Sequence, residues 1–275
     1  MFNRRTRPAV VASLVNQVVC EHGSPADFGN PERVAVLVHW SVQPVVSRSL
    51  RELRRQLAQH GYRTVIVSAA EFEQPLDWGD TLPADAIVLR KPNIGYDFGS
   101  WAVGLGVLPA ITQAPYVILA NDSVLGPFTD IGWLLAQFED SIADVWGLTD
   151  TRQFSHHLQS YFLGYRNGVL AERPLQEFFA GVREERSKWE IIKHNELALS
   201  SLLHREGYIT RSAFRGDDVV DAGDNPVIAG WRALIERGFP FIKRQIVTDP
   251  AVAPRSELIA REVQAVFGAR IEEWI

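Results

Sequence analysis

The sequence has few of the features that assign a chain to a large class at once. Its 275 residues contain one cysteine, Cys20, so neither an internal disulfide nor a cysteine-based metal site is expected, and a reducing compartment is the simpler inference. No apolar run approaches the roughly 18 residues that a membrane span needs. A formal net charge of -5, without any block of lysine and arginine, argues against nucleic acid as a partner.

Several motifs of common enzyme classes are also missing. No GxxxxGK[ST] loop occurs, and no GxGxxG follows the first predicted strand, so nucleotide hydrolysis and hydride transfer are poorly supported. The GxSxG elbow of many hydrolases is absent too. A metal-dependent phosphohydrolase would need more carboxylates than the ends of the predicted strands offer.

The first 24 residues have a basic start and a short apolar stretch, as a signal peptide would. Asn16 and Gln17 interrupt that stretch, however, and no small-x-small cleavage site follows it. A short amphipathic helix is therefore the preferred interpretation, and Arg4, Arg5 and Arg7 leave a peripheral membrane contact as the alternative. We expect a cytoplasmic protein, with the inner face of the membrane as its other potential place.

The order of the predicted elements indicates an α/β fold. The β-branched run RVAVLVHWS predicts a strand buried on both faces, and the helix expected over 41–62 places Leu50, Leu53 and Leu57 on one face. The runs TVIVSA and DAIVLRK follow as strands, so a mainly parallel sheet flanked by helices is expected. Later strands are predicted at YVILA, ADVWGLTDT and HLQSYFLGYR, the last suited to a sheet edge or an antiparallel strand, and later helices over 100–112, 126–140 (with Thr129 or Asp130 as cap), 174–185, 190–208, 227–238 and 256–274. We expect residues 1–32 to form an N-terminal helix and linker, 33–250 the main domain, and 251–275 a C-terminal helix packed on it.

Polar side chains follow two of these strands. The segment KPNIGYDFGSW comes directly after the strand ending at Arg90, and its glycines at 95 and 99 allow a sharp turn or a close approach to a ligand. Asn93 and Asp97 would then point toward that ligand. The next strand, YVILA, ends in a second polar cluster, so one site is expected at the carboxyl ends of the sheet. Taken singly, each residue is explained equally well by helix capping or an Asx turn. The second cluster consists of Asn121, Asp122 and Ser123.

Three other positions leave alternatives open. Glu196 lies near the amino end of the helix predicted over 190–208, where it either complements the helix dipole, which periodicity favours, or acts as a general base. His156 and His157 are adjacent on a predicted strand and therefore point to opposite faces, so that only one of them lines a site. His39 and Trp40 either stack on a base or pack a loop.

The motifs HWS, NIGYDFGSW, ILANDSVLGPF, WGLTDT, HLQSYF and the late NP...PFIKR together resemble the rhamnan synthesis protein F family, from about Arg33 to about Val247. These are enzymes linked to bacterial cell-surface polysaccharides. The sequence also resembles inverting glycosyltransferases of the GT-A fold. Asn93 and Gly95 match their NxG element, the triplet at 121–123 stands where their DxD motif would be, and Asn195-Glu196 stands where a Glu/Asp pair opens a later helix.

The resemblance implies a GT-A-like glycosyltransferase domain over 33–250 with a helical C-terminal extension. It implies transfer of a sugar, with L-rhamnose from dTDP-L-rhamnose as first choice, to a cell-surface polysaccharide or a lipid-linked saccharide. Glu196, or in second place Asp150, would deprotonate the acceptor in an inverting displacement. The donor side would comprise His39, Trp40, Ser68, Asn93, Gly95, Asp97, Asn121, Asp122 and Ser123, and the acceptor or diphosphate side His157, Gln159 and Lys243.

The triplet Asn121-Asp122-Ser123 departs from DxD at both outer positions. Asp122 alone offers a carboxylate to a divalent cation, so dependence on Mg²⁺ or Mn²⁺ is doubtful. A basic group could neutralise the diphosphate instead, and His157, Arg166, Lys193 and Lys243 are candidates. The same departure supports an alternative function, a non-catalytic module that binds a sugar nucleotide or a glycan within a polysaccharide assembly complex.

Overall fold

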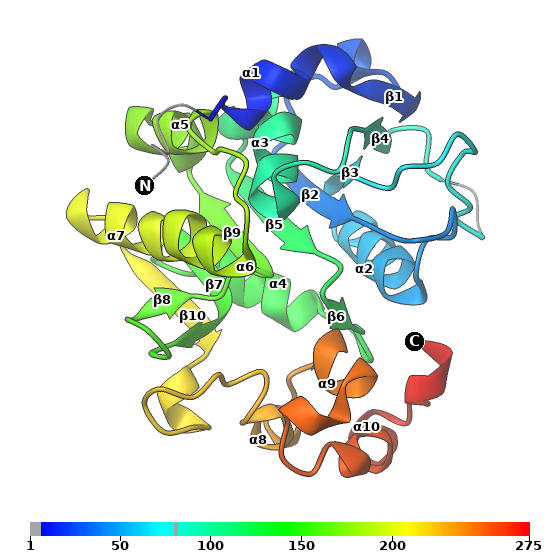
Figure 1. Cartoon of the computed structure of the whole chain (residues 1–275), viewed down its shortest axis with the longest axis vertical. Helices are drawn as coiled ribbons and strands as arrows, with labels where there is room; N and C mark the ends of the chain where they lie inside the picture. Colours follow the sequence, from blue (N-terminus) through cyan, green and yellow to red (C-terminus); the bar gives the residue numbers. More distant parts are fainter. Residues whose placement is uncertain (1–6, 80–81) are drawn as a thin grey trace.

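A nine-stranded sheet lies at the centre of the computed structural model, which describes residues 7–79 and 82–275 (Figure 1). Its strand order is β1-β4-β3-β2-β5-β9-β7-β10, with β8 paired to β7 beside this path. Only β1, β8 and β9 run antiparallel to their neighbours, so the predicted fold class, a mainly parallel sheet flanked by helices, is confirmed. The strands are β1 (Val19–His22), β2 (Arg33–His39), β3 (Arg63–Ser68), β4 (Ile87–Arg90), β5 (Tyr116–Asn121), β7 (Val145–Thr151), β8 (His157–Leu158), β9 (Phe162–Arg166) and β10 (Thr210–Phe214).

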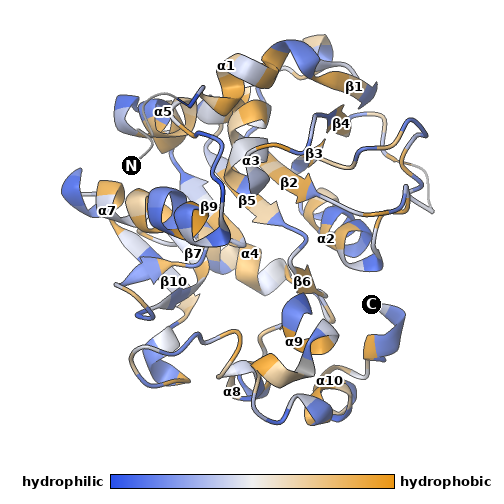
Figure 2. Cartoon of the chain, in the orientation of Figure 1, coloured by the Kyte–Doolittle hydropathy of each residue, from blue (hydrophilic) through white to orange (hydrophobic). Residues whose placement is uncertain are grey.

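Both faces of the sheet are covered by helices, which explains the unbroken apolar run of β2. Val34, Val36 and Val38 belong to one apolar core, whereas Ala35 and Leu37 belong to another on the opposite face. The strands are accordingly among the most apolar parts of the chain, while the outward faces of the helices are polar (Figure 2). The first core includes α1 (Val10–Leu14), α3 (Tyr96–Val107), α5 (Arg173–Ala180) and α7 (Leu197–Arg205), and the second includes α2 (Arg48–Gln59) and α4 (Gly132–Glu139).

The order in which the chain places its strands across the sheet changes direction between β2 and β5. From β2 the chain adds β3 and then β4 on one side, and β5 then pairs with the other side of β2. Parallel pairing runs from Arg33 opposite Tyr116 to Val38 opposite Asn121. The carboxyl ends of β2 and β5 therefore lie side by side where the sheet changes direction, which is where open α/β sheets form a crevice for ligands.

The C-terminal part of the chain forms a third apolar core below the large sheet in Figure 1. It is joined to the rest through β6 (Val124–Leu125), which pairs antiparallel with β11 (Ile242–Lys243). Trp274, near the end of the chain, meets Phe128 edge to face with ring centroids 5.1 Å apart. The helices of this part are α8 (Trp231–Glu236), α9 (Arg244–Thr248) and α10 (Ile259–Phe267).

Several elements differ from the prediction. The N-terminal helix is shorter than expected, and β1 follows it as an unpredicted strand at the edge of the sheet. The run HLQSYFLGYR forms two strands, of which β9 lies inside the sheet between β5 and β7, so the prediction of a sheet edge was wrong while that of an antiparallel strand is confirmed. The helix expected over 126–140 begins only at Gly132, whose N–H donates to the predicted cap Asp130 (2.8 Å).

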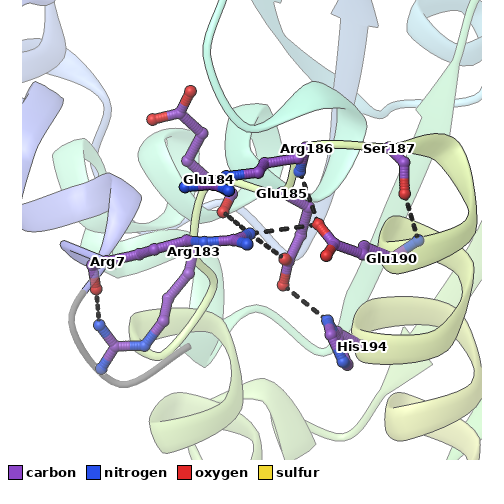
Figure 3. A network of polar contacts seen from close by, with 8 residues as sticks. All are labelled: Arg7, Arg183, Glu184, Glu185, Arg186, Ser187, Glu190 and His194. Atoms are coloured by element: carbon purple, nitrogen blue, oxygen red, sulfur yellow. Dashed lines mark hydrogen bonds and ion pairs between the residues drawn. The ribbon is translucent and has the colours of Figure 1, made fainter. Parts of the chain in front are cut away.

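A network of charges joins the N-terminal segment to α6 (Lys188–Ile191) and to residues on either side of it (Figure 3). Arg7 donates to the carboxylates of Glu185 (2.8 Å) and Glu190 (3.2 Å) and to the carbonyl of Glu184. The buried Glu185 carboxylate also accepts from His194 Nδ1 (3.0 Å). Arg7 is thus engaged within the protein, whereas Arg4 and Arg5, the other arginines of the expected membrane contact, lie outside the described residues. Among the helices of the described part, none has the length and apolar character to cross a bilayer.

Candidate functional site

Several of the predicted donor residues lie at the carboxyl ends of β2 and β5. The N–H of Trp40, directly after β2, donates to Asp122 Oδ2 (2.9 Å), which joins the ends of the two strands. His39 is buried, and its Nδ1 lies 3.0 Å from Ser68 Oγ at the end of β3. Burial, aided by the charge of Arg90, lowers the pKa of His39 to about 4, so this ring is neutral at pH 7. His39 and Ser68 therefore lie buried at the carboxyl ends of β2 and β3, and Trp40, which follows β2, is 51% exposed.

A chain of hydrogen bonds connects the second polar cluster to α3 and β11. Lys243 Nζ donates to Ser123 Oγ (2.8 Å), which in turn donates to Asn121 Oδ1 (2.6 Å). The backbone N–H of Ser123 also donates to this oxygen. Because an N–H can only donate, the atom of the Asn121 amide that faces it must be the oxygen, which fixes the orientation of the amide. Asn121 Nδ2 therefore faces Asp97 Oδ2, at 2.7 Å. A cation and a carboxylate thus stand at the two ends of one relay.

The charges of this cluster are poorly solvated, and their pKa values shift accordingly. Burial raises the pKa of Asp122 to about 7, the charge of Asp97 raises it further, and the Trp40 N–H and Arg244 act against this. The pKa of Asp97 is also raised by burial, although Lys243 and Asn121 oppose the change. Burial lowers the pKa of Lys243, while the carboxylates of Asp97 and Glu196 work to keep it charged. Burial is therefore the largest influence on all three groups, and the opposite charges of the cluster partly offset it.

Glu196 lies within a continuous helix and not at its amino end. That helix begins with α6, capped by Ser187, passes through a π-helical turn over Ile192–Glu196, and continues as α7. The effect of the helix dipole fades within the first turn, so it does not account for a carboxylate at position 196. The prediction that Glu196 complements the helix dipole, which periodicity favoured, is therefore wrong. Single π-turns inside α-helices occur frequently at functional sites.

The Glu196 carboxylate is held by two side chains from the β8–β9 region. Oε1 lies 3.0 Å from His157 Nε2, and Oε2 accepts a hydrogen bond from Ser160 Oγ (2.6 Å). His157 Nδ1 donates to the carbonyl of Ser155 (2.7 Å). Both ring nitrogens therefore face acceptors, which is the arrangement of an imidazolium. Burial disfavours this charge, but the hydrogen bond and charge of Glu196 outweigh it and raise the pKa of His157.

The two histidines have different partners, although His156 precedes β8 and does not lie on a strand as predicted. His157 is buried against Glu196, whereas His156 is exposed and its Nε2 lies 3.0 Å from Asp150 Oδ2. The other oxygen of Asp150 accepts from the N–H of Gly216 (2.6 Å). Both oxygens of Asp150 are thus engaged, one by His156 and one by the backbone after β10.

Glu196, with its partners His157 and Ser160, lies near the polar cluster, which we call the donor-side cluster after the predicted donor residues that it contains. This cluster consists of Asp97, Asn121, Asp122, Ser123 and Lys243. The charge of Glu196 raises the pKa of Asp97 and favours the charged form of Lys243, so the three groups lie within electrostatic reach of one another. Lys243 also lies 5.5 Å from the centre of the Tyr161 ring, on the strand connection that carries Ser160. The structure therefore brings together predicted residues from β5, α3, β8, β11 and the α6–α7 helix.

Other predicted residues occupy different places. Gly95 starts α3 in a left-handed conformation (φ +87°), and the space where a side chain would stand is filled by Val10, so this glycine serves helix packing and not the approach of a donor. Asn93 is exposed, and its backbone N–H donates to Glu71 (3.2 Å). Gln159 is buried and engaged by Thr149 (2.7 Å) and Asn225 (3.1 Å), which gives it a structural role.

Two of the basic residues that were candidates for neutralising the diphosphate lie away from the donor-side cluster. Arg166 pairs with the first residue of β5 and donates to the carbonyl of Glu139 (2.9 Å), so it lies at the opposite end of the sheet from Asn121. Lys193 is exposed on the π-helical turn. Lys243 is the basic residue that reaches the donor-side cluster.

Two residues of the site were not predicted. Arg244 lies beside Asp122, where its charge acts on that carboxylate and its Nε is 3.4 Å from the Asp122 carbonyl. Ser160 bonds Glu196 but resembles an ordinary strand residue in the sequence. The only signals were the position of Arg244 next to Lys243 and the position of Ser160 within the HLQSYF motif.

The residues present fit a divalent cation poorly. Asp122 is bonded by Trp40, Asn121 turns its amide nitrogen toward Asp97, and Lys243 and Arg244 bring positive charge to the same place. Within the described residues no group of three or more carboxylate, imidazole or thiol side chains is arranged to hold a metal. Hard cations bind through several oxygen ligands, which this cluster does not offer.

The fold and the site define an α/β protein with a cluster of polar and charged side chains at the point where its sheet changes direction. A family model described as Rhamnan synthesis protein F matches residues 77–268. The chain therefore belongs to the rhamnan synthesis protein F family, as the motifs predicted, and this membership supports a role in sugar transfer.

Curated relatives and a solved structure are also similar to this chain. Virulence protein VirA of Vibrio anguillarum (strain ATCC 68554 / 775) is 28% identical over 223 residues, which cover 69% of this chain and 71% of that protein. The uncharacterized protein y4gN of Sinorhizobium fredii (strain NBRC 101917 / NGR234) is 24% identical over 155 residues, or 54% of this chain and 40% of that protein. The catalytic domain of Drosophila beta1,4galactosyltransferase 7, in complex with xylobiose, aligns with a TM-score of 0.35 and 11% identity over 70% of this chain and 68% of that one.

Proposed function

We propose that the protein is a GT-A-like glycosyltransferase that works by a single inverting displacement. The donor would be a nucleotide sugar, with dTDP-L-rhamnose as first choice, and the acceptor a cell-surface polysaccharide or a lipid-linked saccharide. Family membership supports the reaction class. The proposed location is the cytoplasm, and a lipid-linked acceptor would bring the protein to the inner face of the membrane.

One observation carries the proposal: Lys243 bonds Ser123 and lies within electrostatic reach of Glu196. Its ammonium donates to Ser123, and its charge interacts with the carboxylates of both Asp97 and Glu196. A site for sugar transfer needs positive charge where a diphosphate leaves and a base where an acceptor hydroxyl arrives. Lys243 and Glu196 supply these two functions side by side.

The chemistry follows from this arrangement. Glu196 takes the proton of the acceptor hydroxyl while the acceptor oxygen bonds to the anomeric carbon of the donor. The bond from that carbon to the diphosphate oxygen breaks, and the diphosphate carries away the electron pair through an oxocarbenium-like transition state. The His157 imidazolium pairs with one oxygen of Glu196 and the Ser160 hydroxyl bonds the other, so the two side chains fix the orientation of the carboxylate. Each carboxylate oxygen retains a lone pair for the acceptor.

We assign the neutralisation of the leaving diphosphate to Lys243 and Arg244 in place of a divalent cation. Both basic groups border Asp122, and charge-assisted hydrogen bonds from such groups bind phosphate oxygens well. With a pKa of about 7, Asp122 is protonated in a large fraction of molecules at neutral pH and can then donate a hydrogen bond to the diphosphate. The exposed Trp40 ring is offered as a stacking surface for the nucleotide base.

The rival proposal is a sugar-nucleotide or glycan binding module without catalysis. Its support is the absence of carboxylates at positions 121 and 123, where Asn121 and Ser123 instead bond each other. This module would bind the same ligands but release no nucleoside diphosphate.

Release of dTDP from dTDP-L-rhamnose, with methyl α-L-rhamnopyranoside as acceptor and with or without EDTA, separates these proposals. We expect turnover that persists in EDTA and falls roughly 10²–10⁴-fold in Glu196→Gln, the usual range for loss of a general base. Binding of dTDP, followed by thermal shift, should be unchanged in that variant.

Glu206→Gln is the matched control, because this exposed carboxylate at the end of the same helix pairs only with Arg205 among the described contacts. Unchanged turnover in Glu196→Gln would remove Glu196 from the role of base. Loss of turnover in EDTA with recovery in Mn²⁺ would replace the assignment of Lys243 and Arg244 by a cation. Binding of dTDP without turnover under any condition would favour the binding module.

A further inference from the structure

A second cavity lies beside Glu196 and shares no residue with the donor-side cluster. Its volume is about 390 Å³, toward the lower end of the roughly 300–1,000 Å³ of small-molecule sites. A larger, open cavity of about 660 Å³ lies near the amino end of β3, remote from the strand ends that carry the site. The smaller cavity is lined by Ser155, His156, His157, Leu158, Ser200, Ser201, His204, Tyr208 and Thr210.

The cavity adjoins the proposed base directly. His157 forms part of its wall and also pairs with Glu196, so a single side chain separates the cavity from the carboxylate. On α7, Ser200 and His204 follow Glu196 at intervals of four residues, which places the three side chains along one face of the helix. The cavity thus continues the helical face on which Glu196 stands.

The chemistry of the lining differs from that of the donor side. None of the lining residues is an aspartate, glutamate, lysine or arginine. The charged group in the lining is the His157 imidazolium, and it is already paired with Glu196, so a diphosphate or a metal ion would find little here to balance its charge. Hydroxyl groups and imidazoles, beside the apolar surface of Leu158, suit a neutral ligand with many hydroxyls and some C–H surface.

An aromatic pair flanks this region. Phe154, which directly precedes the lining residue Ser155, meets Trp189 of α6 with ring centroids 5.1 Å apart. The two side chains come from segments far apart in the sequence, and they remain 49% and 51% exposed. Exposed apolar surface beside a polar cavity marks a binding site, and the C–H face of a sugar ring packs well on an aromatic ring.

We infer that this cavity is an acceptor subsite, which binds a neutral saccharide unit next to the one that receives the transferred sugar. The acceptor would extend from Glu196 past His157 into the cavity, with Phe154 and Trp189 bordering its path. The inference rests on the proposed function, since it assumes that a saccharide approaches Glu196. It adds that affinity depends on the length of the saccharide.

The test is a binding series that requires no turnover. Methyl α-L-rhamnopyranoside and the α-linked rhamnose disaccharide and trisaccharide are titrated into the full chain in the presence of dTDP, with calorimetry as the readout. We expect the trisaccharide to bind about tenfold more tightly than the monosaccharide, and Ser200→Trp, which fills the cavity, to abolish this difference. His204→Ala should reduce it without adding bulk, which guards against misfolding of the tryptophan variant.

Arg205→Ala is the matched control, because Arg205 neighbours His204 on the same helix but does not line the cavity. Equal affinity for all three saccharides, or no binding of any, overturns the inference. It is also overturned if both cavity variants bind the trisaccharide as the unmodified chain does. Length-dependent binding without release of dTDP from dTDP-L-rhamnose would retain the subsite and reject the transferase, so the two failures are distinguishable.

Discussion

His157 illustrates how single residues define this site. Its Nδ1 faces a backbone carbonyl and its Nε2 faces the Glu196 carboxylate, so the ring satisfies both contacts only when both nitrogens carry protons. Since the pKa of His157 is raised, this contribution to stability is complete below the ordinary pKa of 6.5 and is lost as pH rises through the higher folded value. The proposed base thus depends on a neighbour that is itself sensitive to pH.

Asp122 gives a pH-dependent prediction of the opposite sign. Its pKa is about 7 in the folded protein against an ordinary 3.8, so the folded state holds more protons than the unfolded state between these values. Asp122 therefore lowers stability progressively as pH rises through this window. Asp122→Asn removes the poorly solvated charge and retains an oxygen that accepts from the Trp40 N–H. We therefore expect this substitution to raise the free energy of unfolding by about 1–3 kcal/mol at pH 8 and by much less at pH 5.

Urea unfolding at both pH values measures this difference. Asp221→Asn, at an exposed position, should show no such dependence on pH. An equal effect of Asp122→Asn at pH 5 and pH 8 would contradict the raised pKa of Asp122.

At the scale of elements, the packing of α1 on α3 explains two glycines of the KPNIGYDFGSW segment. A side chain on Gly95 would come within 2.9 Å of Val10 Cγ2, and one on Gly99 within 3.3 Å of Val10 Cγ1. Both glycines therefore allow the N-terminal helix to lie close to α3. Asp97, in the first turn of α3, is held at the site by this contact.

Gly95→Ala should therefore be more destabilising than its backbone conformation alone implies. The left-handed conformation costs about 1–2 kcal/mol for alanine, and the clash with Val10 adds about 1–3 kcal/mol. Gly207→Ala is the matched control, because Gly207 has a similar φ of +79° and open space around it. Chemical denaturation of both variants gives the comparison, and Val10→Ala should relieve part of the cost in the Gly95 variant. Equal costs at the two glycines would reject the packing explanation.

The sequence predicts the large elements well and the short ones poorly. The strand ends at His39 and Asn121 could be located because a long apolar run marks each buried strand. Strands of two residues, such as β6 and β11, have no periodicity to detect, and their pairing joins segments more than a hundred residues apart. The place of Lys243 in the site depends on that pairing, so it followed from the family resemblance and not from a local pattern.

Misplaced residues have similarly physical causes. Arg166 was a candidate for the diphosphate because the position of β9 inside the sheet could not be read from its alternation. Glu196 was assigned to the amino end of its helix because α6 and the π-turn lack a regular apolar face. In both cases the deciding information is tertiary, since neighbours in space are distant in sequence.

Segments far apart in the chain are joined by the network in Figure 3, which connects Arg7, ahead of α1, to the helix that carries Glu190 and His194. Arg7 → Met would leave the buried Glu185 carboxylate without its arginine, although His194 still donates to it. We expect a loss of about 1–3 kcal/mol in the free energy of unfolding. Turnover should fall as well, because the same helix carries Glu190, His194 and Glu196.

Arg173→Met serves as the control, since Arg173 forms an ion pair with Glu177 on α5 that is exposed to solvent and therefore contributes little to stability. Urea unfolding and release of dTDP give the two readouts. If both arginine variants behave alike, Arg7 does not support the helix that carries Glu196.

The pairing of β6 with β11 has a consequence for when the protein becomes active. Lys243 reaches Ser123 only after the chain has returned to lay β11 beside β6. During synthesis, strands β2 to β5 and their polar ends emerge long before this lysine does. A nascent or prematurely terminated chain would therefore display the donor-side residues without their cation. The proposed sugar transfer would therefore begin only after β11 has been synthesised and has paired with β6.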